Sequence, residues 1–330
     1  MTGLLYTAEM PFEAARRDAR GWHGHSFRLR VRAAPAEGAR GAMALAQAAG
    51  EAVAPLDYSL LNEHLPAVDD RGLLKALGQR LQDRGIAPRR LALRSAPDRG
   101  AAWGEDGWSW RTFCFEAAHR LPHVPQGHPC GRMHGHGYRV TLESTGLDAR
   151  QLGALWAPVG AEIDHACLND FLPNPTSELI AAWLWQRLEA AANGIRRIHV
   201  HETEHSGCVY DGSHHTIWKA QRFEAATRVA GASDRRDRLH GHGYRLRVHV
   251  TTPLDQDLGW TLDYADVKRA FAPVREALDH QRLDTLEGLE GGDVATLARW
   301  LVAETAPRLP QLSRIDVFER NGVGAIAYPE

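Results

Sequence analysis

The chain has 330 residues, enough for two or three small domains. Its 44% hydrophobic and 24% charged residues are ordinary for a globular protein, and a formal net charge of −2 gives no reason to expect a nucleic-acid or membrane partner. The N-terminus lacks a signal-peptide pattern, no apolar run would span a bilayer, and four cysteines are too few for a disulfide scaffold, so we expect a cytoplasmic protein.

Three motifs recur in the same order along the chain. They are F-E-A-A at Phe12, Phe115 and Phe223, H-G-H at His23, His134 and His240, and an aspartate-containing triplet at Leu56–Tyr58, Ile163–His165 and Leu278–His280. A spacing of roughly 110 residues between copies indicates an internal triplication. We therefore predict repeats over residues 1–110, 111–214 and 215–330.

Each repeat is predicted to hold two strands, two helices and two further strands. In the second repeat, Thr112–Ala118 and Ile195–Thr203 alternate as strands do. Between them, apolar residues at helical spacing predict a helix from about Thr176 to Asn193, with Asn174 or Thr176 as its cap. Because a four-stranded sheet leaves two open edges, three such sheets are expected to pair edge to edge. The predicted fold is α+β: three tandem ββααββ repeats forming an intramolecular pseudo-trimeric antiparallel β-barrel with helices outside.

The second repeat carries a candidate metal site. His134 and His136 are two residues apart, so on a strand both side chains lie on one face, and His119 ends the preceding strand. Three histidines leave a fourth zinc position open, as in catalytic sites. Cys130 would either close the site as a fourth ligand or stand off the metal as a thiolate base whose pKa the cation lowers. A single H-G-H would fit two exposed histidines equally well.

Two other histidine patterns point to no site. His201–His205 spells H-E-x-x-H, a zinc-protease pattern that requires a helix, whereas this run alternates like a strand and would hold its histidines about 13 Å apart. Further histidines are expected to be exposed loop residues; they include His123, His128, His214 and His215.

Ordered motifs of the second repeat match a known family. They are F-E-A-A-H-R-L-P-H-V-P ending at Pro125, C-G-R-M-H-G-H at Cys130–His136, I-D-H-A-C-L-N-D at Ile163–Asp170, N-P-T-S-E at Asn174–Glu178 and H-E-T at His201–Thr203. The repeat resembles the bacterial 6-carboxytetrahydropterin synthases, relatives of 6-pyruvoyl-tetrahydropterin synthase in the tunnelling-fold (T-fold) class. The first and third repeats resemble the family more weakly.

The resemblance implies roles for these residues. Zinc would take His119, His134 and His136, with Cys130 as the base. Glu202 would anchor the pterin through two N–H groups, with Thr176 as a second substrate-binding residue, and Asp164 with His165 would match the family's proton relay.

The other two repeats depart from this pattern. The first repeat has Arg16 in place of the first zinc histidine, Tyr58 in place of the relay histidine and Ser95 near the anchor position. The third repeat has Thr227 at the first histidine and Arg236 at the cysteine. We therefore expect both to lack metal.

The third repeat nevertheless keeps Asp279, His280 and an anchor-like Glu319. Because the family takes its relay pair from a neighbouring unit, we hypothesise that Asp279 and His280 serve Cys130 within one chain. The alternative is Asp164 and His165, from the same chain or a partner chain. The family's G-W-x-x-D-[FY] segment is present only in the third repeat, as Gly259–Tyr264, so the packing of the second repeat is expected to differ there.

These features predict a zinc-dependent lyase that converts 7,8-dihydroneopterin triphosphate to 6-carboxy-5,6,7,8-tetrahydropterin, acetaldehyde and triphosphate, on the path to queuosine. Alternatives are a 6-pyruvoyl-tetrahydropterin synthase and a non-catalytic pterin- or zinc-binding protein. Three repeats in one chain would replace a trimer, so two stacked chains, a homodimer of pseudo-trimers, are expected.

Overall fold

A computed structural model describes residues 3–19, 21–35, 38, 40–104, 106–320 and 322–330. Its elements follow the predicted order of two strands, two main helices and two strands, three times over, with short additional pieces. The strands are β1 (Leu4–Asp18), β2 (Gly21–Ala33), β3 (Ser59–Leu60), β4 (Arg90–Ala96), β5 (Arg99–Trp103), β6 (Trp108–His119), β7 (His134–Ser144), β8 (Ala166–Cys167), β9 (Ile195–Thr203), β10 (Ser206–Tyr210), β11 (His215–Thr227), β12 (His240–Thr251), β13 (Leu312–Arg320) and β14 (Val323–Ala327). The α-helices are α1 (Ala42–Val53), α2 (Leu61–His64), α3 (Asp70–Gln82), α4 (Ala149–Ile163), α5 (Ser177–Ala191), α6 (Tyr264–Leu278) and α7 (Val294–Thr305).

The strands form one sheet that returns to its starting strand. Its order is β14-β13-β12-β11-β10-β9-β7-β6-β5-β4-β2-β1, and β14 then pairs antiparallel with β1 from Leu4↔Ala327 to Thr7↔Gly324. The two-residue strands β3 and β8 add parallel to β1 and β6. This closed antiparallel topology, with three sets of ββααββ elements, confirms the predicted fold class.

The chain divides into two compact units that do not coincide with single repeats. The first unit comprises residues 1–107, 220–248 and 268–330, and the second comprises residues 108–219 and 249–267. The second predicted repeat therefore shares its unit with a stretch of the third, which includes Gly259–Tyr264. The predicted repeat boundaries near residues 110 and 214 stay predictions.

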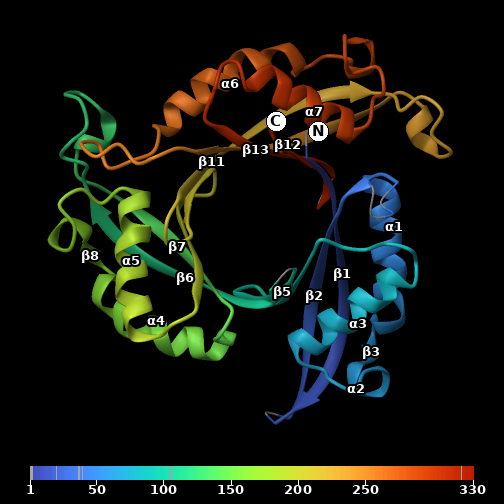
Figure 1. Cartoon of the computed structure of the whole chain (residues 1–330), viewed down its shortest axis with the longest axis horizontal. Coiled ribbons are helices and arrows are strands. Elements are labelled where there is room, and N and C mark those ends of the chain that lie inside the picture. The colour runs from blue at the N-terminus through green and yellow to red at the C-terminus, as the bar shows by residue number, and fades with distance from the viewer. Residues whose placement is uncertain (1–2, 20, 36–37, 39, 105, 321) are drawn as a thin grey trace. The chain divides into compact units, whose positions relative to one another are not determined.

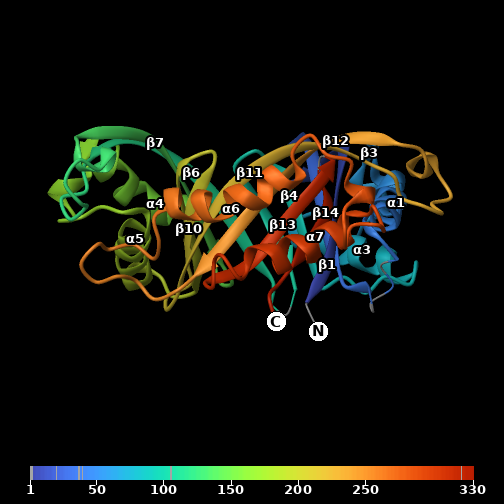
Figure 2. The same ribbon diagram turned by 90° about the horizontal axis from the view of Figure 1, so that it is seen from above.

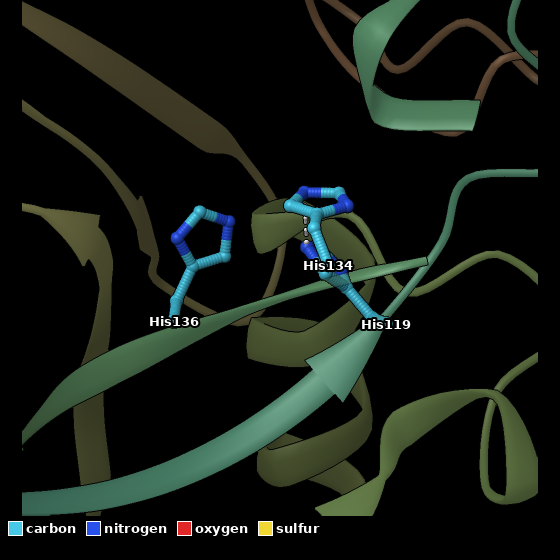
Figure 3. Close-up of side chains that lie close together, drawn as sticks. All are labelled: His119, His134 and His136. Atoms are coloured by element: carbon cyan, nitrogen blue, oxygen red, sulfur yellow. Dashed lines mark hydrogen bonds between the residues drawn. The ribbon is translucent and has the colours of Figure 1, made fainter. Parts of the chain in front are cut away.

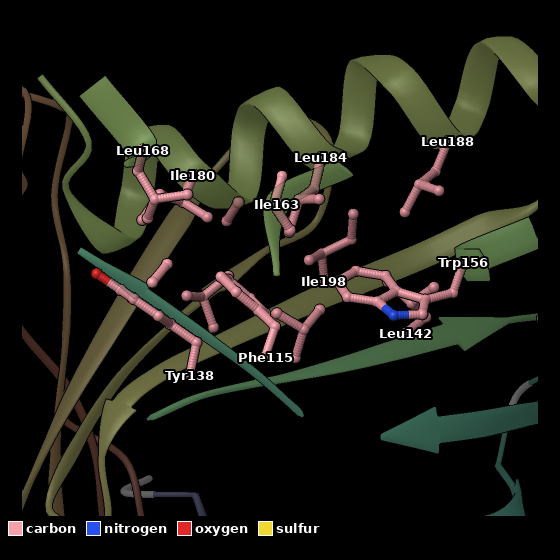
Figure 4. Close-up of a cluster of buried hydrophobic side chains, with 14 of the residues drawn as sticks. Phe115, Tyr138, Leu142, Trp156, Ile163, Leu168, Ile180, Leu184, Leu188 and Ile198 are labelled. Atoms are coloured by element: carbon pink, nitrogen blue, oxygen red, sulfur yellow. The ribbon is translucent and has the colours of Figure 1, made fainter. Parts of the chain in front are cut away.

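The core of the second unit lies between β6, β7, β9 and the helices α4 and α5 (Figure 4). Alternation along the strands sends every second side chain into this core, as with Tyr138, Val140 and Leu142 on β7. The helices contribute an apolar stripe that includes Trp156 and Leu184. Burying each such side chain stabilises the fold by roughly 1.5–3 kcal/mol, so this face fixes the register of the sheet.

The helix predicted after residue 175 is present as α5. Thr176 caps its start, because its hydroxyl oxygen accepts a hydrogen bond from the Leu179 N–H at 3.2 Å. Gly194, just beyond the helix, has a φ of 100°, a left-handed conformation that favours glycine. Cap and glycine are the two signals from which the sequence predicts this helix.

In the first unit, helices also lie against one face of the strands. Figure 1 shows α1 and α3 beside β1 and β2, and Figure 2 shows α7 over β13 and β14. No helix within the described ranges is long and apolar enough to cross a membrane.

Candidate metal centre

Strand pairing brings the three predicted histidines together. His119 is the last residue of β6 and is directly opposite His134, the first residue of β7, while His136 is opposite Ala117. Since residues two apart share a face, all three imidazoles lie on one side of the β-hairpin (Figure 3). One ring nitrogen from each lies within 4.8 Å of the others, and the Nε2 atoms of His119 and His134 are 3.1 Å apart.

Backbone carbonyls orient two of the rings. The His119 Nδ1 lies 2.9 Å from the Pro175 carbonyl oxygen, and the His134 Nδ1 lies 2.8 Å from that of Arg132. A carbonyl oxygen only accepts, so both Nδ1 atoms are assigned the hydrogen and both Nε2 atoms are left with lone pairs. Two lone pairs facing each other at 3.1 Å repel unless a cation lies between them. The donor set therefore fits a divalent metal held by imidazole nitrogens.

Burial favours the neutral form of two of these imidazoles, those of His119 and His136. It lowers the pKa of His119 to about 4, with the Pro175 carbonyl opposing the shift and the other two histidines adding to it. Burial, followed by the neighbouring His134, also lowers the pKa of His136. Neutral imidazole is the metal-binding form, so at neutral pH these two rings need not lose a proton before they bind a cation.

Cys130 lies beside this group without belonging to it. It sits in a short 3-10 turn, Pro129–Gly131, and is half-buried; within the described ranges the close ligand group contains only the three histidines. Burial raises the pKa of the Cys130 thiol, and the negative charges of Glu202 and Asp263 raise it further. The thiolate expected from the sequence thus depends on a cation that offsets these effects.

Glu202 lies on β9 on the face that Val200 turns to the core, by alternation. Burial, reinforced by Glu178 and opposed by Lys219, raises the pKa of Glu202 to about 8. The hydroxyl of Tyr138 is also buried and has no hydrogen-bond partner in the described part of the chain, and burial followed by the charges of Glu202 and Cys130 raises its pKa well above the usual range. Polar groups in such surroundings are typical of a ligand-binding site.

The Gly259–Tyr264 segment packs against the start of α5. Glu178 is fully buried, and its Oε1 accepts hydrogen bonds from the backbone N–H of Thr261 at 2.8 Å and from its hydroxyl at 3.0 Å. The Thr176 hydroxyl donates to the Gly259 carbonyl oxygen, and the Tyr264 and Ser177 hydroxyls are 3.0 Å apart. A stretch of the third predicted repeat therefore supplies both donors to Oε1 of a buried carboxylate in the second, while the Ser177 hydroxyl donates to its Oε2.

Gly259 itself is required by this packing. Its φ is 69°, and a Cβ atom there would lie 2.7 Å from Leu179 Cδ1 and 2.8 Å from Asn174 Nδ2. These contacts also bear on Thr176, whose hydroxyl already has two protein partners. Its predicted role in substrate binding gains no support from these contacts and stays a prediction.

Asp164 and His165 form a carboxylate–imidazole pair beside the edge of β6, just before β8 pairs with that strand. Asp164 Oδ1 accepts from the Glu116 N–H at 2.9 Å and lies 3.2 Å from His165 Nδ1. His165 borders a hollow lined by residues that include Glu116, Gly135 and Gly137, which alternate with the metal-site histidines along β6 and β7.

The third predicted repeat builds the same turn. Asp279 Oδ1 accepts from the Glu224 N–H at 3.0 Å and lies 3.2 Å from His280 Nδ1. His165, His280 and Tyr58 have φ angles of 58°, 60° and 51°, and they are the non-glycine residues with positive φ among the described ones. Such strain at exposed positions is typical of functional sites, and in the first repeat the turn persists with a tyrosine in place of the histidine.

In the first repeat a guanidinium group lies against the H-G-H motif. The Arg16 Nε lies 3.3 Å from His23 Nε2, and its Nη1 donates to Asp70 Oδ1 at 2.8 Å and to the Val68 carbonyl at 2.9 Å. Arg16 thus presents a permanent cation to the histidine whose counterpart in the second repeat faces the metal site. In the third repeat the Thr227 hydroxyl donates to the Gly292 carbonyl oxygen instead.

Two histidines predicted to be exposed loop residues lie elsewhere. His215 is half-buried on β11, with its ring stacked on Tyr210 and its Nε2 3.1 Å from the Glu178 carbonyl oxygen. His128 is partly buried and forms an ion pair with Asp263 at 3.2 Å. The exposure prediction is therefore wrong for both. For the contact between His128 and Asp263, the one signal in the sequence is the position of His128 two residues before Cys130.

Comparison with known proteins places the chain in a family. The sequence model described as 6-pyruvoyl tetrahydropterin synthase matches residues 109–213 and again residues 216–330. A 6-carboxy-5,6,7,8-tetrahydropterin synthase from Synechocystis sp. is 40% identical over 118 residues, covering 31% of this chain and 90% of the relative. A putative enzyme of the same name from Archaeoglobus fulgidus is 34% identical over 99 residues, covering 27% and 83%.

Among solved structures, the 6-pyruvoyl tetrahydropterin synthase of Caenorhabditis elegans is 20% identical, with a TM-score of 0.32 over 34% of this chain and 95% of that chain. The two successive matches to the family model cover well over half of the sequence. The chain therefore belongs to the 6-pyruvoyl tetrahydropterin synthase family of pterin synthases.

Proposed function

We propose that this protein is a zinc-dependent 6-carboxytetrahydropterin synthase that converts 7,8-dihydroneopterin triphosphate to 6-carboxy-5,6,7,8-tetrahydropterin, acetaldehyde and triphosphate, for queuosine biosynthesis. The observation that carries the proposal is the convergence of His119, His134 and His136, with a half-buried thiol and a half-buried carboxylate close by. The names of the Synechocystis and Archaeoglobus relatives support the carboxy-producing reaction.

The three histidines would hold zinc through their ring nitrogens. The lowered pKa values of His119 and His136 and the facing Nε2 lone pairs of His119 and His134 fit such an ion. Bound there, zinc would supply Lewis acidity toward the hydroxyls of the substrate side chain and the adjacent C–H group.

Glu202 would orient the pterin ring. Its carboxylate makes no hydrogen bond among the described residues, and a pterin offers an amino group and a ring N–H side by side. Two N–H donors would favour the ionised carboxylate and lower its raised pKa when the substrate binds. Glu178, already satisfied by Thr261 and Ser177, would keep the neighbouring wall rigid.

Cys130 would accept the proton from the substrate side chain, and a carboxylate–imidazole pair would carry that proton away. Triphosphate would leave, a water molecule would add to the side-chain carbonyl carbon next to the ring, and a retro-aldol-type cleavage of the neighbouring carbon–carbon bond would release acetaldehyde, with the oxygen of the water kept in the carboxyl group. His165 borders a hollow lined by Glu116 and Gly137 of its own hairpin and also by His136. The candidate donors are Asp279 and His280 of this chain, or Asp164 and His165 of the same chain or of a partner chain.

Two other functions remain as alternatives. A 6-pyruvoyl-tetrahydropterin synthase would use the same groups and stop before carbon–carbon cleavage. A non-catalytic pterin- or zinc-binding protein would need no base. The second repeat keeps Cys130 beside the three histidines together with Glu202, which favours catalysis.

We also propose a homodimer of pseudo-trimers in the cytoplasm. The residue just before each H-G-H motif is a large apolar side chain that is more than half exposed: Trp22, Met133 and Leu239. Exposed apolar side chains at equivalent positions of all three repeats are expected at a surface that a second copy covers.

Incubation of zinc-loaded protein with 7,8-dihydroneopterin triphosphate should release acetaldehyde. Cys130→Ala should lower the rate by at least about 100-fold because it removes the proton acceptor. Cys114→Ala, an exposed thiol on β6, is the matched control and should keep the wild-type rate. A pyruvoyl product without acetaldehyde would select the first alternative, and no turnover at all would support the binding protein.

Zinc binding should depend on the histidines of the second repeat and not on those of the third. His134→Ala should weaken zinc binding by more than about tenfold, measured by competition with a chromophoric chelator, because it leaves two imidazoles. His240→Ala removes the corresponding histidine of the third repeat and should leave the zinc affinity unchanged. Equal losses in both variants would contradict a single site in the second repeat.

Separate substitutions distinguish the relay donors. If Asp279 and His280 serve Cys130, His280→Ala should lower kcat by about 100-fold while His165→Ala leaves it near the wild-type value. The reverse result would assign the relay to Asp164 and His165. A fully active His280→Ala enzyme would exclude the intrachain hypothesis.

Light scattering should give a mass of about twice the 36.5 kDa of one chain. Replacing Trp22 and Leu239 together by serine should shift the protein toward the monomer, because both apolar side chains would lose their cover. A wild-type monomer or a trimer of chains would contradict the proposed assembly.

A further inference from the structure

The loop that carries Cys130 is tied to the third predicted repeat at two histidines. His123 Nδ1 lies 2.8 Å from the carbonyl oxygen of Asp257, and His128 Nε2 lies 3.2 Å from Asp263 Oδ2. Both partners belong to residues 249–267, which share a compact unit with the second repeat. Of these two links, only the one through His128 continues to the cysteine.

His128 binds on both sides of its ring. Its Nδ1 accepts a hydrogen bond from the backbone N–H of Cys130 at 3.2 Å, while its Nε2 faces Asp263. A backbone N–H can only donate, so Nδ1 must be unprotonated and Nε2 must carry the hydrogen. The cysteine backbone therefore selects the tautomer that donates to Asp263, and Asp263 in turn stabilises the tautomer that holds the cysteine.

Asp263 is itself held rigidly. Its Oδ1 accepts from the Ala265 N–H at 2.8 Å, and its carbonyl oxygen accepts from the Asp266 and Val267 N–H groups at the start of α6. Both carboxylate oxygens are thus used, one for the helix start and one for His128. The centroid of the Trp260 ring lies 5.9 Å from that of the His128 ring.

We infer that His128 and Asp263 are positioning residues for the Cys130 thiol, so that a carboxylate of the third repeat orients the base of the second. The inference rests on the proposed function, since it takes Cys130 as the reacting thiol. It adds two residues that link the start of α6 to the Cys130 backbone: Asp263 contacts the His128 imidazole, and the imidazole accepts a hydrogen bond from the Cys130 N–H. The Cys130 carbonyl oxygen is fixed separately, by the Leu121 N–H at 2.8 Å.

If His128 only capped the turn before Cys130, its second contact, to Asp263, would not be required. In the third repeat Asp234 occupies the corresponding position, and its Oδ1 accepts from the Arg236 N–H at 2.9 Å. An aspartate is therefore enough to cap this turn where no cysteine follows. Histidine makes the same cap and also reaches across to Asp263, which a shorter side chain does not do.

Asp263→Asn tests the coupling with little change of shape. The amide has one oxygen, and if that oxygen keeps the Ala265 N–H, an N–H₂ group faces His128 Nε2. The imidazole must then carry its hydrogen on Nδ1, where it repels the Cys130 N–H instead of accepting from it. A wrong tautomer of this kind also disables a catalytic histidine–aspartate pair when the aspartate is replaced by asparagine. We expect kcat to fall about 10- to 100-fold with KM changed less than about threefold and with zinc content unchanged.

Two substitutions at His128 separate its two bonds. His128→Asn keeps an acceptor for the Cys130 N–H and loses Asp263, whereas His128→Gln reaches toward Asp263 and leaves the Cys130 N–H unpaired. Both should lower kcat, and the Asn variant combined with Asp263→Asn should be no slower than the slower single variant, because the residues act as one unit. His123→Ala is the matched control: it removes the neighbouring contact to Asp257 and should keep the wild-type kcat. A fully active His128→Asn enzyme would overturn the inference.

A second measurement does not depend on turnover. The rate of Cys130 alkylation by iodoacetamide in zinc-loaded protein, followed by peptide mass spectrometry, should change at least about fivefold in Asp263→Asn, since thiol reactivity follows its surroundings. Cys167 in the same molecules should react at the wild-type rate. An unchanged Cys130 rate would overturn the positioning role, whether or not the wild-type protein releases acetaldehyde. Absence of acetaldehyde from the wild type, with the alkylation change present, would instead reject only the proposed function.

Discussion

The antiparallel pairing of His119 with His134 is the constraint on which the candidate metal centre depends. One residue of slippage between β6 and β7 would turn His134 and His136 to the opposite face and bring Gly135 beside His119. The register is set by burial further along the same strands, where Tyr138 and Val140 enter the core beneath α4 and α5. The apolar core therefore determines where the three candidate metal ligands lie, although none of the core residues is itself a candidate ligand.

The second repeat satisfies its own buried carboxylate only in part, through the Ser177 hydroxyl, which donates to Glu178 Oε2 at 2.8 Å. Glu178 lies at the start of α5 and is 2% exposed. An unpaired carboxylate at this position would lower the stability of the fold by several kcal/mol. The donors to the other oxygen of Glu178 come from Thr261, and the same segment brings Asp263 to the loop of Cys130. The Gly259–Tyr264 segment, which has no counterpart in the second repeat, thus contacts the second repeat from the connection between β12 and α6 of the third.

Periodicity in the sequence was sufficient for the local elements and for the histidine group. The alternation of β6, β7 and β9, the cap at Thr176 and the glycine after α5 are local signals, and each predicted its element closely. The contacts of His128, Arg16 and the Gly259–Tyr264 segment join residues 50 or more positions apart or depend on a loop, and no local pattern encodes such pairs. The raised pKa of Cys130 was missed for the same reason, because it arises from burial and from Glu202 and Asp263.

The first two repeats differ in the positive charge available to their close imidazoles. Close imidazoles on one hairpin need a cation or a donor between them. In the first repeat Arg16 presents a guanidinium to His23 and is anchored by Asp70, so that hairpin carries its own positive charge. The second repeat has His119 at the equivalent place, so under the proposed function a bound ion would supply the positive charge there. Replacement of a cation-binding side chain by a cationic one would then be enough to turn a reactive hairpin into a supporting one, and copies of one sequence could divide chemistry and support within a single chain.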